Sequence, residues 1–166
     1  MDSQRAGLEK ARADLAMAEK IAVNAKISRP GVCNAIETVL VHSAVLEKFA
    51  ATTGRALLKN GVQLVSFCST SPIEENNNVF TTFTFDNSLK EEDFQAITKF
   101  ADNDYVSTYK LQLIAGRNLQ PSGWTREFLV NESFVKSLGF KKPEDILNKE
   151  ISIMGGLIKC PVVGVL

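Results

Sequence analysis

The chain has 166 residues, of which 45% are hydrophobic and 23% charged, a composition typical of one soluble globular domain with a core. Nineteen Lys and Arg residues balance nineteen Asp and Glu residues, so no basic field attracts nucleic acid, and we expect no nucleic-acid partner. The sequence contains no secretory signal, no apolar run of the roughly 18 residues that a bilayer span needs, and no disulfide framework among its three widely spaced cysteines.

The N-terminal residues 2–26 are rich in alanine and contain no proline. Apolar residues recur in heptad spacing at Leu8, Ala11, Leu15, Ala18, Ala22 and Ala25. This pattern predicts a helix that ends before Pro30 and Gly31 and that needs a partner to lie against, since alanines bury little area. We therefore expect two parts, an N-terminal helix or stalk over 1–30 and one domain over 31–166.

A β-α-β unit is predicted next. Residues 35–41 (AIETVLV) are β-branched and favour a strand, Ser43 can cap a helix that Asn60 and Gly61 end, and residues 62–68 (VQLVSFC) alternate as a second strand. The polar segment that follows, residues 69–78, is expected to be an exposed loop.

Two strands, 79–85 and 94–100, are expected to pair antiparallel, because the same alternation of apolar residues repeats after an acidic turn. Asp102 can cap a helix that runs to Gly116.

In the C-terminal part, the sequence predicts a strand over 126–130 and a helix that ends at Gly139. It also predicts a helical turn from Pro143 and a hairpin of residues 151–154 and 158–166. The chain stops inside an apolar strand, so we expect it to be a piece of a longer protein. The predicted fold class is α+β, with a mixed sheet, a β-α-β unit, packed helices and an N-terminal Ala-rich helix.

No catalytic, cofactor-binding or metal-binding residues are predicted. His42 is the single histidine, and no motif accompanies it, so a structural role is favoured over a place in a catalytic triad. Residues 102–104 (DND) lack the glycine and glutamate of a calcium loop, and neither glycine-rich nucleotide motif occurs.

Candidate partner contacts lie in two loops. One is the loop tip formed by Glu74, Glu75, Asn76 and Asn77, for which plain solvation is the alternative. The other is Trp124, which either anchors a partner or packs over the nearby strand. Arg117, after a glycine turn, is expected to form a turn-locking salt bridge, with anion binding as the alternative.

Four motifs follow one another in the second half of the chain. They are a turn with Gly116 and Arg117, an apolar strand that leads into Asn131 and Glu132, residues 143–151 (PEDILNKEI) and residues 162–165 (VVGV). In this order they resemble the extracytoplasmic core domain of MacB/FtsX-type ABC transporter permeases, and residues 71–73 (SPI) resemble the Bacteroidetes-type members. The resemblance covers roughly residues 35–166 and leaves residues 1–30 unexplained.

This resemblance implies a MacB-like periplasmic core domain with a porter-like β-α-β unit, on the periplasmic face of the inner membrane. It implies a non-catalytic module that transmits ATP-driven motion in export or efflux, with ATP bound by a separate ATPase subunit or domain and no cofactor of its own. The implied partners are the ABC ATPase, the permease membrane helices and a periplasmic adaptor protein, in a membrane-embedded homodimer. The alternative is a periplasmic domain that binds a small molecule or peptide in a pocket lined by phenylalanines. The oxidising periplasm would permit Cys33 and Cys68 to pair, and the sequence leaves this open.

Overall fold

The structure is a computed structural model that describes residues 2–29, 31, 35–70, 72 and 78–166, with side chains described from residue 15 onward. The predicted α+β class is confirmed, with helices and two sheets in one chain. The chain divides into two compact units, Met1–Val65 and Ser66–Leu166, whereas the predicted parts were 1–30 and 31–166. Among the described residues, no helix has both the length and the apolar character needed to cross a bilayer.

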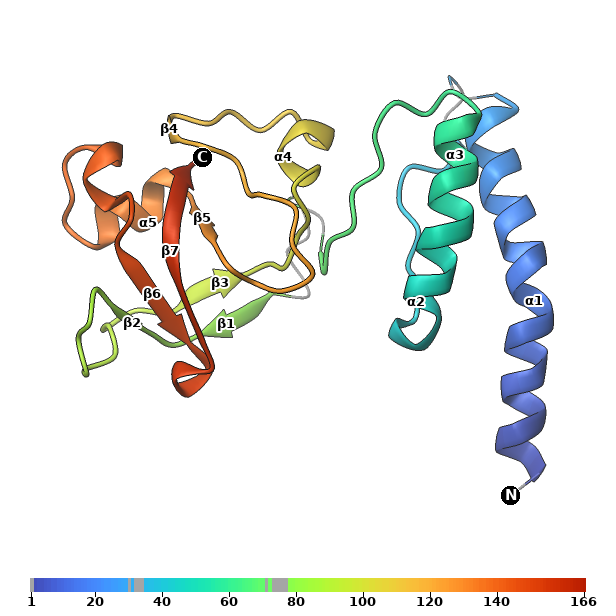
Figure 1. Ribbon diagram of the computed structural model, residues 1–166, viewed down its shortest axis with the longest axis horizontal. Coiled ribbons are helices and arrows are strands. Elements are labelled where there is room, and N and C mark those ends of the chain that lie inside the picture. Colours follow the sequence, from blue (N-terminus) through green and yellow to red (C-terminus); the bar gives the residue numbers. More distant parts are fainter. Residues whose placement is uncertain (1, 30, 32–34, 71, 73–77) are drawn as a thin grey trace. The chain divides into compact units, whose positions relative to one another are not determined.

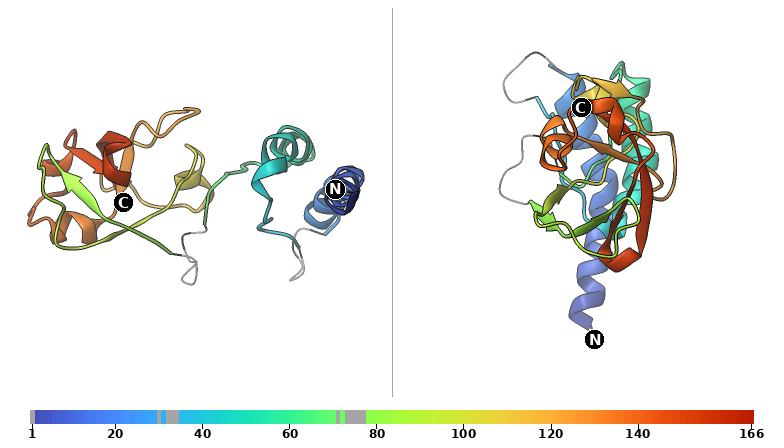
Figure 2. Two further views of the ribbon diagram at one scale, coloured as in Figure 1. Left: turned by 90° about the horizontal axis from the view of Figure 1, so that it is seen from below. Right: turned by 90° about the vertical axis from the view of Figure 1, so that its left-hand side faces the viewer.

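The first unit is helical. Helix α1 (Asp2–Ile27) confirms the predicted Ala-rich helix, and α2 (Ser43–Phe49), a π-helical turn (Ala50–Gly54) and α3 (Arg55–Lys59) follow one another without a break. This second helical stretch lies beside α1, as the views in Figures 1 and 2 agree, and α1 contacts both the π-helical turn and α3. Ala22 of α1 is buried, because its small side chain lets the two helical stretches approach closely.

Local signals set the ends of the second helical stretch. His42, rather than the predicted Ser43, is the N-cap, and its Nδ1 accepts the Ala44 backbone N–H at 3.2 Å. This contact gives the single histidine a structural role as a helix cap. The predicted stop is confirmed, since α3 ends at Lys59 and Gly61 has a φ of 92°, a left-handed value that favours glycine.

The β-α-β unit is not formed. Residues 35–41 and 62–67 contain no strand, and only the helix between them was predicted correctly. A strand needs a neighbour to satisfy its backbone groups, and β-branched composition alone does not provide one. The Ile36 N–H instead donates to the Ala25 carbonyl near the end of α1, at 3.3 Å.

The second unit is built around β7 (Ile158–Val165), the longest strand (Figure 1). The first half of β7 pairs antiparallel with β6 (Glu150–Ile153), which in turn pairs with β2 (Phe83–Phe85). The second half lies between β4 (Ala115–Gly116), which is antiparallel to it, and β5 (Phe128–Val130), which is parallel. The predicted mixed sheet is therefore present.

Two of the predicted hairpin contacts are confirmed. Strands β1 (Val79–Thr81) and β3 (Ala96–Thr98) pair antiparallel as a separate two-stranded sheet, so the single strand predicted over 79–85 divides in two. A short turn, η3 (Met154–Gly156), joins β6 to β7 as the glycine pair predicted.

Three short helices complete the unit: α4 (Tyr105–Thr108), α5 (Glu132–Ser137) and the 3₁₀ helix η2 (Pro143–Ile146). The helix predicted from Asp102 to Gly116 is wrong beyond its first turn. Lys110 has a φ of 52°, a left-handed value that stops a helix, and the chain then runs extended into β4.

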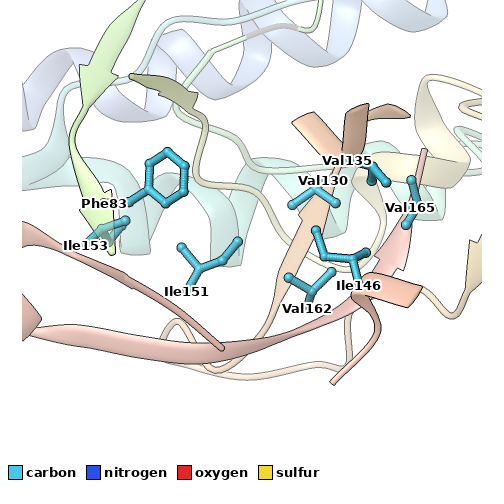
Figure 3. Packing of buried hydrophobic residues seen from close by; sticks show 8 residues of the cluster. All are labelled: Phe83, Val130, Val135, Ile146, Ile151, Ile153, Val162 and Val165. Carbon is cyan, nitrogen blue, oxygen red and sulfur yellow. The ribbon is translucent and has the colours of Figure 1, made fainter. Parts of the chain in front are cut away.

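The core of the second unit joins the sheet to α5 and η2 (Figure 3). It consists of Phe83, Val130, Val135, Ile146, Ile151, Ile153, Val162 and Val165. Phe83 is 1% exposed, and its ring lies 5.2 Å from that of Phe94 and 5.1 Å from that of Phe134. These phenylalanines fill the core by packing on one another, as expected of rings with these separations.

Candidate functional site

A charged pair closes the base of the loop between β4 and β5. Arg117 Nη2 lies 2.5 Å from Glu127 Oε1, and Arg117 Nη1 lies 3.1 Å from Glu127 Oε2. The Gln120 backbone N–H also donates to Glu127 Oε2, at 2.9 Å. The Arg117 guanidinium lowers the pKa of the Glu127 carboxyl, and the same bond raises the pKa of Arg117. The predicted turn-locking salt bridge is therefore present.

Gly116 allows this loop to start close to the sheet. Its φ is 73°, and a Cβ at this position would overlap the Val163 carbonyl oxygen of β7. A glycine is thus required both for the backbone angle and for the space. The Gly-Arg motif has a structural reason within this fold.

A hollow of about 300 Å³ lies beside the loop. It is lined by Gln120, Pro121, Ser122, Gly123, Arg126 and Glu127. Trp124 lies in sequence between the lining residues Gly123 and Arg126 and is 82% exposed, so it does not pack over the neighbouring strand. The next residue is fixed to β7, because the Cys160 thiol donates to the Thr125 carbonyl oxygen at 3.4 Å.

The two remaining motif residues begin a helix. Asn131 is the N-cap of α5, and its Oδ1 accepts the Phe134 backbone N–H at 2.9 Å. Glu132 lies in the first turn and pairs with Lys136 at 2.9 Å. Both interactions stabilise the first turns of the helix, and neither requires a ligand. The other predicted contact residues, 74–77, lie outside the described residues.

Cys68 lies among aromatic and acidic groups at the start of the second unit. Burial raises the pKa of its thiol, against the lowering effect of a hydrogen bond with Tyr109. Burial also raises the pKa of Tyr105 to about 12, and the rings of Tyr105 and Tyr109 lie 4.9 Å apart. The site therefore holds a protonated thiol at neutral pH, which is a poor nucleophile.

Asp102 organises the backbone next to this thiol instead of capping a long helix. Its carboxylate accepts from the Ser66 hydroxyl and the Phe67 backbone N–H, both at 2.7 Å, and from the Asp104 N–H at 3.1 Å. These three bonds satisfy the carboxylate and join the start of the unit to the segment before α4.

The remaining thiol in the described part is also inert. Cys160 is 6% exposed, and burial raises its pKa. Cys68 and Cys160 are free thiols, and Cys33 lies outside the described residues. Within the described part of the chain, no group of three His, Cys, Asp or Glu side chains could hold a metal ion.

A second hollow, of about 290 Å³, lies beside the turn after β2. It is lined by Thr84, Asn87, Ser88, Leu89, Glu150, Ser152 and Lys159. Lys159 forms a salt bridge with Glu150 at 2.9 Å, so its charge is already compensated. Both hollows have volumes near the lower end for ligand sites, and neither is lined by phenylalanine as the pocket hypothesis expected.

Two charged residues of the loop site, Arg126 and Glu127, were not among the predicted site residues. A usable signal was present, because Arg117 and Glu127 are opposite charges that bracket a loop containing proline and glycine. Such a pair can close a loop, as it does here.

Part of the chain is similar in sequence to proteins named as reductases. A stretch of 52 residues is 58% identical to a gamma-glutamyl phosphate reductase of Clostridium kluyveri, and 54% identical to the one of Carboxydothermus hydrogenoformans. A stretch of 54 residues is 61% identical to the gamma-glutamyl phosphate reductase of Kineococcus radiotolerans. The matched stretch is 31–32% of this chain, and the chain spans about 12% of the length of these relatives. No family model and no solved structure matches the chain.

These names contradict the resemblance to ABC permeases. The curated relatives are reductases, so the hypotheses of a non-catalytic transport module and of its alternative, a periplasmic binding domain, were wrong. The location on the periplasmic face of the inner membrane and the transport and efflux roles depended on that resemblance and are corrected with it. The expectation of no cofactor is contradicted as well, because the matched relatives are named reductases, and a reductase takes electrons from a reductant. The predicted partners, including the absence of nucleic acid, stay predictions.

Proposed function

We propose that this chain contributes a segment of a reductase that acts on gamma-glutamyl phosphate. The observation that supports this proposal is the identity of 52–61% over 52–54 residues, which recurs in reductases from several genera. Identity at this level over a continuous stretch favours a shared local structure and a shared local role.

The chemistry of such a reaction defines what the complete site must supply. Reduction of an acyl phosphate adds a hydride to the carbonyl carbon, and the bond from that carbon to the phosphate oxygen breaks, so that an aldehyde and phosphate are formed. A hydride donor and a group that binds the phosphate are therefore required. The two hollows of the second unit are small, and we assign neither of them a role in this reaction.

We also assign no role in the reaction to the thiols of Cys68 and Cys160. An activated cysteine needs a lowered pKa, and the pKa values of Cys68 and Cys160 are both raised. We propose instead that the shared stretch supplies one part of the site and that the rest of a reductase supplies the remainder, in accord with the share of about 12%.

A segment exchange tests this proposal. The aligned stretch of a clostridial reductase is replaced by the stretch of this chain, and the rate of gamma-glutamyl phosphate reduction is measured. We expect a kcat/KM within about tenfold of the parent, which corresponds to about 1.4 kcal/mol of transition-state stabilisation. The matched control inserts an equally long stretch of this chain from outside the aligned region, and it should abolish activity.

Folding is checked independently by circular dichroism. A chimera that folds like the parent but has lost activity more than a hundredfold contradicts the proposal. If the full exchange does not fold, two chimeras that each carry half of the stretch replace it, and inactivity of both folded halves is again a contradiction.

A further inference from the structure

The loop between β4 and β5 presents an aromatic side chain to solvent on a fixed backbone. Trp124 is 82% exposed, and it is the single tryptophan of the chain. Tryptophan is the residue most often found as a binding anchor at protein interfaces, since its burial there removes a large apolar area from water.

The backbone on both sides of Trp124 is held in place. The loop is closed at its base by two hydrogen bonds between Arg117 and Glu127. The Thr125 carbonyl oxygen accepts a hydrogen bond from the Cys160 thiol of β7. The Trp124 N–H also donates to the Ser122 hydroxyl oxygen at 3.3 Å. A preordered loop loses little conformational entropy when it binds, so these contacts favour use of the loop as a docking surface.

The loop carries one uncompensated positive charge. Arg117 neutralises Glu127, whereas Arg126 is exposed, lines the hollow and forms no salt bridge with any described residue. A guanidinium of this kind binds a carboxylate through two parallel hydrogen bonds. The charge of the surface is therefore complementary to an acidic side chain.

We infer that the loop over residues 117–127 is a docking surface for a protein partner that presents a carboxylate next to an apolar side chain. The carboxylate pairs with Arg126, and the apolar side chain packs on Trp124. A nucleic acid is disfavoured, because a single arginine on a chain with no net charge gives no field for a phosphate backbone. This inference is independent of the reductase segment proposed above.

A peptide selection tests the inference directly. The full chain is immobilised, a random peptide library displayed on phage is selected against it, and an enriched peptide is titrated while the fluorescence of Trp124 is followed. We expect enriched peptides to carry Asp or Glu beside an apolar residue, and binding to shift the emission to shorter wavelength as the indole leaves water.

Three variants separate the roles of the residues. Trp124→Ala should weaken binding of the peptide tenfold or more, measured by calorimetry because the fluorophore is lost, and Arg126→Gln should weaken it several-fold. Lys141→Gln, which removes an exposed charge outside residues 117–127, should leave the affinity unchanged. Circular dichroism confirms that each variant is folded.

Several results would overturn the inference. These are a selection that enriches no peptide, enriched peptides without acidic residues, and an affinity that Trp124→Ala and Arg126→Gln leave unchanged. An affinity that responds to Lys141→Gln as strongly as to Arg126→Gln would show that net charge alone governs binding, and it would overturn the inference as well.

Discussion

Replacement of Gly164 by alanine should strongly destabilise the second unit. Gly164 lies in β7 between two strands, opposite Gly116 of β4 and Leu129 of β5. A Cβ at this position would overlap the Arg117 carbonyl oxygen and lie 2.9 Å from Leu129 Cδ2. Because one of these neighbours is backbone, a side-chain rotation cannot make room.

The expected loss of stability follows from the shift of β4 that the added methyl group requires. Overpacking of this kind costs about 1–3 kcal/mol. If β4 shifts away from β7, the hydrogen bonds from Ile114 N–H to Val165 and from Arg117 N–H to Val163 weaken, at about 1 kcal/mol each. We therefore expect a loss of about 3 kcal/mol in the free energy of unfolding, which lowers the Tm of a unit of about 100 residues by roughly 12 °C or more.

The assay is urea unfolding followed by the near-ultraviolet circular dichroism of Tyr105 and Tyr109, the two tyrosines of the chain, which both lie in the second unit and of which Tyr105 is buried. The matched control is Gly123→Ala, because a Cβ at Gly123 meets nothing within 4 Å, and we expect a change of less than about 0.5 kcal/mol. If Gly164→Ala were as stable as the control, the close approach of β4 to β7 would be refuted.

Three further predictions concern single groups. Thr53→Val should stabilise the first unit by about 1 kcal/mol in thermal unfolding followed by circular dichroism, because the Thr53 hydroxyl is fully buried and has no hydrogen-bond partner among the described residues. Thr52→Val is the control and should not stabilise the unit, because the Thr52 hydroxyl donates to the Lys48 carbonyl oxygen at 3.1 Å; destabilisation by Thr53→Val would show that the Thr53 hydroxyl has a partner. Glu127→Gln should destabilise the second unit at pH 7; since the folded-state pKa of Glu127 is lowered, its contribution is fully present above the ordinary value of 4.5 and is lost as the pH falls through the lowered pKa, so the effect of the substitution should shrink steadily in acid. An effect of Glu127→Gln that does not change as the pH falls below 4.5 would contradict this reasoning. Cys160 should resist iodoacetamide at neutral pH and Cys68 should react more slowly than a free thiol, as measured by peptide mass spectrometry, and rapid labelling of Cys160 would contradict its burial.

The helices and turns that local chemistry determines could be predicted from the sequence. The alanine-rich composition predicted α1, and the glycine after α3 predicted its end, because Gly61 adopts a left-handed φ. The glycine pair before β7 predicted the hairpin with β6 for the same reason. These signals lie within a few residues of the structure that they determine.

Features that depend on distant partners could not be predicted. Residues 35–41 have strand composition but no neighbouring strand, so the β-α-β unit did not form. Asp102 was expected to cap a helix, but it bonds to Ser66 and Phe67, which lie more than thirty residues earlier in the chain. For each of these segments the local sequence permits both the predicted and the observed structure, and only tertiary contacts decide between the two.

The motifs behind the permease resemblance have structural explanations. Gly116 is required by the approach of β4 to β7, and Asn131 caps α5. Pro143 starts η2, where its fixed φ and missing N–H suit the first turn. Devices that solve a folding problem recur in unrelated proteins, so a series of them carries little information about function. The loop of Arg126 and Trp124 was predictable only in part, because exposure and charge pairing are tertiary properties.

The proposed function is tested most directly by the rate at which the chimeric reductase reduces gamma-glutamyl phosphate. The proposal predicts that a folded chimera carrying the stretch of this chain keeps a kcat/KM within about tenfold of its parent, while the control chimera is inactive. A folded chimera with no measurable reduction would contradict it, and the similarity of 52–61% would then reflect shared structure without shared function.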